Sequence, residues 1–144
     1  MSNSRQPRVL HSLHLAHGAL FRALDRRLRE TEGITTAHQV ILFTLTAEDG
    51  LPSSEIARRA GHSKSRLTGL VDTLEAKGLV ERRASKKDGR VHLLHVTRAG
   101  RKLIARTVDH ARDMNAALLA PFSARDRDTI QSFLEHVLAE AGKI

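Results

Sequence analysis

The stretch PSSEIARRAGHSKSRLTGLVDTLEAKGLVERRASKKDGRVHLLHV, residues 52–96, decides the fold. Pro52 and the serines after it are typical of a helix start, and Gly61 marks the turn that ends this short helix. Ser63 is the expected cap of a second helix, which ends near Gly78 because glycine readily adopts the left-handed conformation found there. One apolar stripe runs along this second helix, formed by Leu67, Leu70, Val71 and Leu74. The pattern predicts two helices joined by a tight turn.

A β-hairpin is predicted directly after these helices. Residues 80–84 and 91–96 have the composition of strands, and Lys87-Asp88-Gly89-Arg90 between them contains the Asp-Gly pair that favours a hairpin turn. Two strands alone are only marginally stable in water. We therefore expect the hairpin to pack on the helices, as the wing of a winged helix-turn-helix.

Two helices are expected on the N-terminal side of this stretch. Apolar residues recur at three- and four-residue spacing between about positions 7 and 29, which puts them on one face of a helix. The next helix starts at Thr35 or Thr36, where Gln39 follows Thr36 at the spacing of a capping box, and it ends near residue 49. Apolar residues surround most of this second helix, so we expect it to be buried.

Two further helices follow the hairpin. Thr97 is the expected cap of a helix that runs to roughly Leu119, and the segment from Ser123 to Asp126 is typical of another helix start. The expected order is therefore four helices, a β-hairpin and two helices. The sequence predicts a mainly α fold, α+β by strict count, in a single domain of residues 1–144.

Positive charge is concentrated in the middle of the chain. The formal net charge is +8, and residues 51–100 hold 11 Lys or Arg against 5 Asp or Glu. A basic excess of this kind favours a polyanionic partner, with nucleic acid before membrane, although a solvated basic face without a partner gives the same count.

Composition excludes several other classes of protein. There is no cysteine, which excludes disulfides, thiolate metal sites and cysteine-based redox sensing. No apolar run approaches the ~20 residues that span a bilayer, and the polar N-terminus does not resemble a signal peptide. We therefore expect a cytoplasmic protein that does not bind membranes.

The helix that begins at Ser63 and the wing carry the side chains expected to bind DNA. The N-terminal residues of a single helix can reach base edges in the major groove, which is about 12 Å wide. Cationic side chains on a thin ribbon suit a narrow minor groove. The candidate contacts are Ser53, Ser63, Lys64, Ser65, Arg66, Thr68, Arg83, Lys86, Lys87, Asp88 and Arg90. Arg82 adds a further cation to the wing, and Asp88 is expected to hold Arg90 in an extended pose.

Four segments together resemble the MarR family of transcriptional regulators. They are Ser54–Gly61, Leu70–Arg82, Asp88–Arg90 and Val96–Gly100. The resemblance implies an obligate homodimer of winged-helix subunits that binds palindromic operators in double-stranded DNA. It also implies that the Ser63 helix enters the major groove and that the Asp88–Arg90 wing enters the minor groove.

The resemblance also divides the chain by role. Residues 35–100 would form the winged-helix DNA-binding lobe, and residues 7–32 and 101–144 a helical dimerisation region. The broad apolar faces of these outer helices support dimerisation independently, because a chain of 144 residues has limited interior to bury them. One departure from the family is Gly69, which stands where a cationic or larger polar residue is common and leaves the operator sequence open.

Histidines are the candidate ligand-binding residues. Family members commonly bind small aromatic or phenolic acids between the dimer helices and the DNA-binding lobe, which points to His14, His17, His38 and His110. A histidine on an apolar helix face is more often a hydrogen-bonded core or interface residue. No two histidines have the His-x-x-x-His spacing on a helix, so we expect neither a bound metal nor another cofactor.

The function predicted from sequence is a dimeric, sequence-specific transcriptional regulator, a repressor released by a small molecule. A sequence-indifferent architectural DNA-binding protein would share the basic patch, and a scaffold could use the winged helix for protein contacts. An enzyme is not expected, because no nucleophile motif, phosphate loop or paired acidic cluster brings catalytic residues together.

Overall fold

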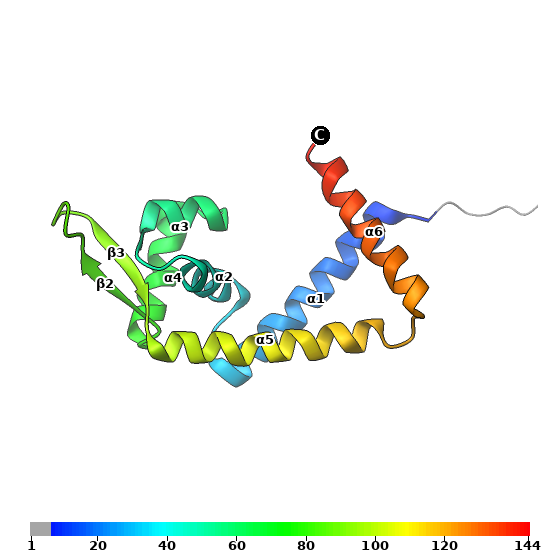
Figure 1. Ribbon diagram of the computed structural model, residues 1–144, viewed down its shortest axis with the longest axis horizontal. Helices are drawn as coiled ribbons and strands as arrows, with labels where there is room; N and C mark the ends of the chain where they lie inside the picture. The colour runs from blue at the N-terminus through cyan, green and yellow to red at the C-terminus, as the bar shows by residue number, and fades with distance from the viewer. Residues whose placement is uncertain (1–6) are drawn as a thin grey trace, which may run out of the picture. The chain divides into compact units, whose positions relative to one another are not determined.

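The computed structural model describes residues 7–144 and confirms the predicted order of elements (Figure 1). Four helices come first, with a short strand before the third: α1 Val9–Glu32, α2 Thr36–Ala47, β1 Leu51–Pro52, α3 Ser53–Ala60 and α4 Lys64–Ala76. The hairpin and two helices follow: β2 Val80–Ala84, β3 His92–Val96, α5 Arg98–Leu119 and α6 Ala124–Ala141. The described chain forms two compact units, with the boundary between Ile104 and Ala105.

The first unit has a core of aliphatic side chains drawn from nearly all its elements. The most deeply buried are Ile34, Ile41, Leu42, Leu45, Ile56, Leu67, Val71, Leu74, Val80 and Leu94. The α4 stripe predicted from sequence supplies three of these. Helix α2 was expected to be buried, but only one of its sides is. Ile41, Leu42 and Leu45 lie in the core, whereas Val40 and Phe43 are exposed.

The start of α2 differs from the predicted capping box by one residue. The Thr36 amide donates to Asp25 Oδ1 of α1 at 2.8 Å, which leaves Thr35 as the cap residue. The Thr35 amide in turn donates to His38 Nδ1 at 3.1 Å, so His38 takes the part that Gln39 was expected to play. Two side chains from different helices thus satisfy backbone donors that the helix itself leaves unpaired.

The sheet has three antiparallel strands in the order β1-β3-β2. Strand β2 pairs with β3 so that Val80 lies opposite Val96 and Arg82 opposite Leu94. Strand β1 pairs with the other edge of β3, with Leu51 opposite Leu94. The sequence did not predict β1, since two residues carry no recognisable strand pattern. Strand β1 thus attaches the predicted hairpin to the chain that leads directly into α3.

The second unit contains the rest of α5 and all of α6. Ser123 caps α6 as predicted, because its hydroxyl accepts a hydrogen bond from the Asp126 amide at 3.1 Å. Arg127 Nε donates to the carbonyl oxygens of Leu119 and Phe122, which ties α6 to the end of α5. No residue of α6 is buried, and its apolar side chains Phe133, Leu134 and Leu138 are exposed. Within residues 7–144, no helix is both long and apolar enough to cross a membrane.

Candidate nucleic-acid interface

Helices α3 and α4 are joined by a short turn whose geometry depends on Gly61. Gly61 has φ of 67°, the left-handed conformation that glycine adopts without steric cost. The His62 amide donates to the Ala57 carbonyl at 3.0 Å and closes the end of α3. The chain then enters α4 directly at Ser63, as a helix-turn-helix requires.

The first turn of α4 is a polar surface above a buried stripe. Lys64, Ser65, Arg66 and Thr68 are exposed, whereas Leu67 is buried in the core. These side chains leave the helix end where free backbone N–H groups and the helix dipole favour an anion. The predicted contact residues of α4 are therefore brought together on one accessible surface.

Two of the α4 hydroxyl groups already take part in local hydrogen bonds. Ser63 Oγ accepts from the Arg66 amide at 3.2 Å, which confirms Ser63 as the helix cap. Thr68 Oγ1 donates to the Lys64 carbonyl at 3.0 Å, which leaves its oxygen lone pairs for an external donor. Ser53, the first residue of α3, is half-buried. Lys64, Ser65 and Arg66 are thus the α4 side chains best placed to donate to DNA.

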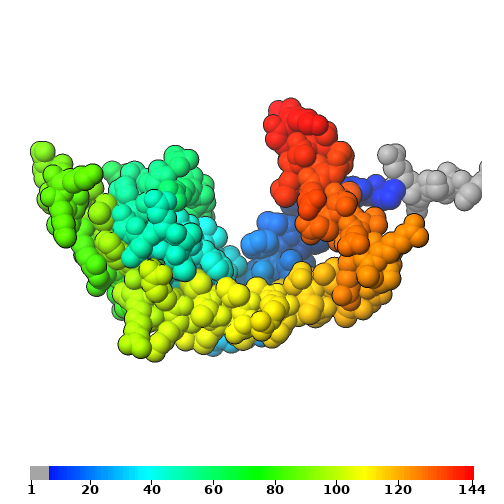
Figure 2. All heavy atoms as spheres, in the orientation of Figure 1, coloured from blue at the N-terminus to red at the C-terminus, as the bar shows by residue number. Residues whose placement is uncertain are grey.

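The tip of the hairpin is ordered by its own polar groups. Asp88 Oδ1 accepts from the Arg90 amide at 3.0 Å and from Arg90 Nε at 3.3 Å. The Arg90 side chain nevertheless remains 93% exposed, and Lys86 and Lys87 beside it are also exposed. In Figure 2 the hairpin, green to yellow-green, lies along the edge of the first unit with its tip projecting outward. The wing therefore presents a cluster of accessible cations.

The two neighbouring arginines of β2 have different surroundings. Arg83 is exposed and pairs with Glu81 of the same strand, beside an open cavity of about 570 Å³ that Lys86 and Lys87 also line. Arg82 instead forms ion pairs with Asp72 and Glu75 of α4. The sequence suggested one group of wing cations, but the structure separates Arg82 from the others.

Asp49 fixes the base of the wing and was not singled out by the sequence. Its carboxylate accepts from the Val96 amide at 2.9 Å, lies 3.2 Å from His95 Nδ1, and is 3.6 Å from Arg101. Burial alone would raise the pKa of Asp49, but the hydrogen bonds from Val96 and His95 outweigh it and lower the pKa. Asp49 therefore stays charged and joins the end of α2 to β3.

The four predicted ligand histidines have different local surroundings. His14 and His17 are exposed on α1, and the His17 ring stacks on Phe21 with centroids 4.4 Å apart. His38 is half-buried and engaged at the start of α2, while His110 belongs to the second unit. Burial and the nearby charge of Lys77 lower the pKa of His38, which favours its neutral form. Among residues 7–144, no three His, Cys, Asp or Glu side chains cluster closely enough to hold a metal ion.

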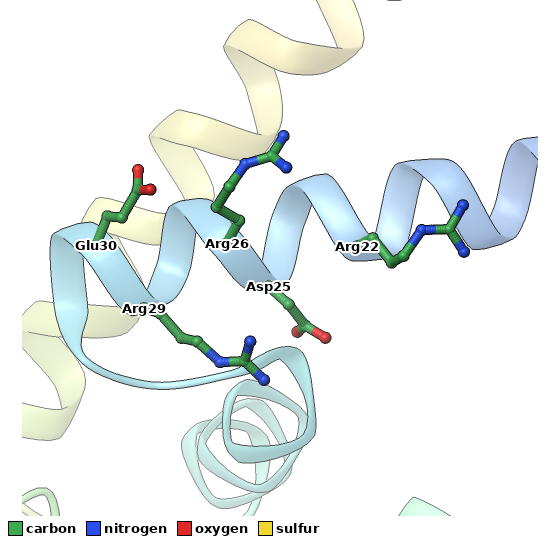
Figure 3. A pocket seen from close by; sticks show the side chains of 5 residues that line it. All are labelled: Arg22, Asp25, Arg26, Arg29 and Glu30. Atoms are coloured by element: carbon green, nitrogen blue, oxygen red, sulfur yellow. The ribbon is translucent and has the colours of Figure 1, made fainter.

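A cavity on α1 is lined by charged side chains that the histidine pattern did not indicate. It has a volume of about 580 Å³ and is lined by Arg22, Asp25, Arg26, Arg29 and Glu30 (Figure 3). In this view Asp25 and Arg29 point toward the neighbouring α2, whereas Arg26 and Glu30 point away from it. The arginine spacing of four and three residues was the signal available from sequence, because it places the three Cα atoms along one side of a helix, although the Arg26 and Arg29 side chains extend in different directions (Figure 3).

Comparison with known proteins identifies the family. A family model described as the MarR family matches residues 32–91. A putative transcriptional regulatory protein for the hcr operon of Thauera aromatica is 30% identical over 126 residues, covering 86% of this chain and 76% of that protein. The chain belongs to the MarR family. Like its curated relatives, it is a transcriptional regulator and not an enzyme.

Two repressors are also similar in sequence to this MarR-family chain. The repressor Rv2887 of Mycobacterium tuberculosis is 32% identical, covering 72% of this chain and 74% of its own. The repressor MdtR of Bacillus subtilis is 33% identical, although this chain spans only 61% of its length.

The solved structures with the same fold include regulators from two other bacteria. MepR, a transcription regulator of the Staphylococcus aureus multidrug efflux pump MepA, is 21% identical with a TM-score of 0.78, covering 91% of this chain and 96% of its own. PcaV of Streptomyces coelicolor is 26% identical with a TM-score of 0.75, covering 94% and 96%. The winged-helix fold of the MarR family is thereby confirmed for this chain.

Proposed function

We propose that this MarR-family chain is a homodimeric repressor that binds a palindromic site in double-stranded DNA and is released by a small aromatic or phenolic acid. The observation that carries the DNA-binding part is the pairing of two polar surfaces in the first unit. The exposed first turn of α4 presents Lys64, Ser65 and Arg66, and the ordered wing presents Arg90. Both surfaces are cationic and both are fixed by local hydrogen bonds.

The proposed contacts follow from the shape of each element. Helix α4 enters the major groove, where Arg66 can donate two hydrogen bonds to a guanine and Lys64 meets phosphate. The wing enters the minor groove through Arg90, helped by Lys86 and Lys87. A structure of the related MepR has been solved with DNA, which supports duplex binding by this fold.

Dimerisation is proposed through α1 and the helices after the wing, within residues 7–32 and 101–144. Large apolar side chains are exposed on each of these helices, including Leu10 of α1, Leu118 of α5 and Leu138 of α6. Exposed apolar surface of this extent is typical of a region that a second chain covers. Residues 35–100 then form the DNA-binding lobe of each subunit.

The ligand is proposed to be an organic anion. PcaV, which shares the fold, has been solved in complex with its natural ligand. In this chain the α1 cavity offers Arg22, Arg26 and Arg29, and guanidinium groups bind carboxylates in a two-point geometry. The candidate ligand contacts also include the four histidines of the sequence pattern, which are His14, His17, His38 and His110.

The DNA-binding part is tested with Arg66→Ala and Arg90→Ala, using a duplex that the wild-type protein recovers from a randomised pool. We expect each change to weaken binding by about 1–3 kcal/mol per subunit, while the dimer seen in light scattering is unchanged. Arg125→Ala, which removes the same charge from exposed α6, serves as the control and should bind like wild type. Wild-type affinity in both interface variants would refute the assigned contacts, and equal affinity for unrelated duplexes would favour an architectural protein.

The ligand part is tested by titrating salicylate into the wild-type protein and into Arg26→Ala. We expect salicylate to raise the melting temperature of the wild type and to weaken duplex binding, with both effects reduced in the variant. Absence of saturable binding would refute an aromatic acid as the ligand class.

A further inference from the structure

Two acidic residues lie on the helix that is proposed to enter DNA. Asp72 is four residues after Thr68 and seven after Ser65, so it shares a helix face with proposed contact residues. Its side chain is 60% exposed, and Glu75 follows one turn later. An uncompensated carboxylate at this position would repel the phosphate backbone. Binding of DNA by this helix therefore requires a cation beside Asp72 and Glu75.

Arg82 of β2 supplies that cation and contacts both acids at once. Its Nη2 donates to Asp72 Oδ1 at 2.7 Å, and its Nη1 donates to Glu75 Oε1 at 2.6 Å. Only 29% of the Arg82 side chain is exposed. The planar guanidinium fork suits a bridge between two fixed carboxylates, which a lysine ammonium would hold less rigidly.

The register of the sheet explains why Arg82 differs from Arg83. Arg82 lies opposite the fully buried Leu94, on the sheet face that packs toward the helices. Because side chains alternate along a strand, Arg83 points to the other face, where it is 61% exposed. Of these two adjacent arginines, Arg82 therefore faces α4 and Arg83 faces away from it.

We propose that Arg82 is a positioning residue, which locks the wing to α4 at a fixed spacing and does not itself contact phosphate. The inference rests on the proposed DNA-binding function of α4 and the wing. Three residues, 77–79, connect α4 to β2, while β1 and Asp49 attach β3 to the rest of the first unit. The Arg82 bridge to Asp72 and Glu75 adds a second attachment between α4 and β2. It also neutralises acids that would otherwise face DNA.

The test compares Arg82→Met with Arg83→Met, two variants of equal charge change, by measuring duplex affinity over a range of salt concentrations. We expect Arg82→Met to lower affinity by about tenfold, in the range of coupling between contacting residues, and most of this loss should persist at high salt, where repulsion from the uncovered Asp72 and Glu75 is screened. Arg83→Met should instead reduce the slope of log K against log salt by about 0.9 for each phosphate that the variant no longer neutralises. A loss for Arg82→Met that disappears at high salt, or wild-type affinity at every salt concentration, would overturn the proposal.

A second variant, Asp72→Asn with Glu75→Gln, keeps the proposal testable if Arg82→Met does not fold. Electrostatics alone predicts tighter DNA binding once two acids are removed. Positioning predicts weaker binding, because Arg82 loses both ionic partners, and tighter binding would overturn it. Failure of wild type to bind any duplex at low salt would instead refute the proposed DNA-binding function itself.

Discussion

Gly100 lies at a close contact where even a methyl group would not fit. A Cβ at this position would be 2.3 Å from the Leu79 carbonyl oxygen and 2.8 Å from Val96 Cγ2. The Leu79 oxygen cannot retreat easily, because it accepts a hydrogen bond from the Thr97 amide at 3.0 Å. Gly100→Ala would therefore push the first turn of α5 away from the turn between α4 and β2.

The cost of this change follows from the contact distances. Ordinary van der Waals contact begins at 3.4 Å, so the helix start must move by roughly 1 Å. Overpacking of this kind costs about 3 kcal/mol, and alanine recovers at most about 1 kcal/mol through its better helix propensity. We expect Gly100→Ala to lose about 2 kcal/mol of unfolding free energy and roughly 4–8 °C of melting temperature.

Urea and thermal unfolding at one protein concentration measure the effect, with Gly69→Ala as the matched control. Gly69 also lies in a helix, but nothing surrounds the position that its Cβ would take. Gly69→Ala should therefore stabilise the chain by about 1 kcal/mol. If Gly100→Ala were as stable as wild type, the close approach of α5 to Leu79 would be wrong.

Two further predictions concern the start of α2 and the dimer. The pKa of His38 is below its usual 6.5 in the folded chain, so the unfolded chain takes up the proton first and stability should fall as the pH drops below 6.5. His38→Gln keeps an acceptor for the Thr35 amide and should flatten this part of the pH profile in urea titrations; an unchanged profile would contradict the role of His38. Leu138→Glu alters a side chain that is 75% exposed in the chain alone, so the fold should persist while sedimentation velocity shows a shift toward monomer. An intact dimer would place Leu138 outside the interface.

Local patterns were sufficient to predict most elements of the fold. Caps such as Ser63 and Ser123 act on amides three residues away, so a short sequence window contains both partners. The same holds for the wing, whose Asp88 and Arg90 are two residues apart. The box at α2 was misplaced because the Thr36 amide is satisfied by Asp25, which lies on another helix.

Contacts between distant residues could not be predicted in this way. Asp49 meets the Val96 amide 47 residues later, and nothing in either local pattern indicates the pairing. The role of Arg82 depends on strand register, because a shift by one residue would exchange its place with Arg83. The sequence also did not reveal that His38 accepts a hydrogen bond from the Thr35 amide, or that arginines line a cavity on α1.

Two copies of the α4 surface and wing are proposed to bind DNA as a symmetric pair. Selection from a pool of duplexes with a randomised core tests this proposal most directly. The recovered sequences should share an inverted repeat whose half-sites lie about one helical turn, ~10 base pairs, apart. Recovery of duplexes without any shared repeat, from a protein that is folded and binds DNA, would contradict it.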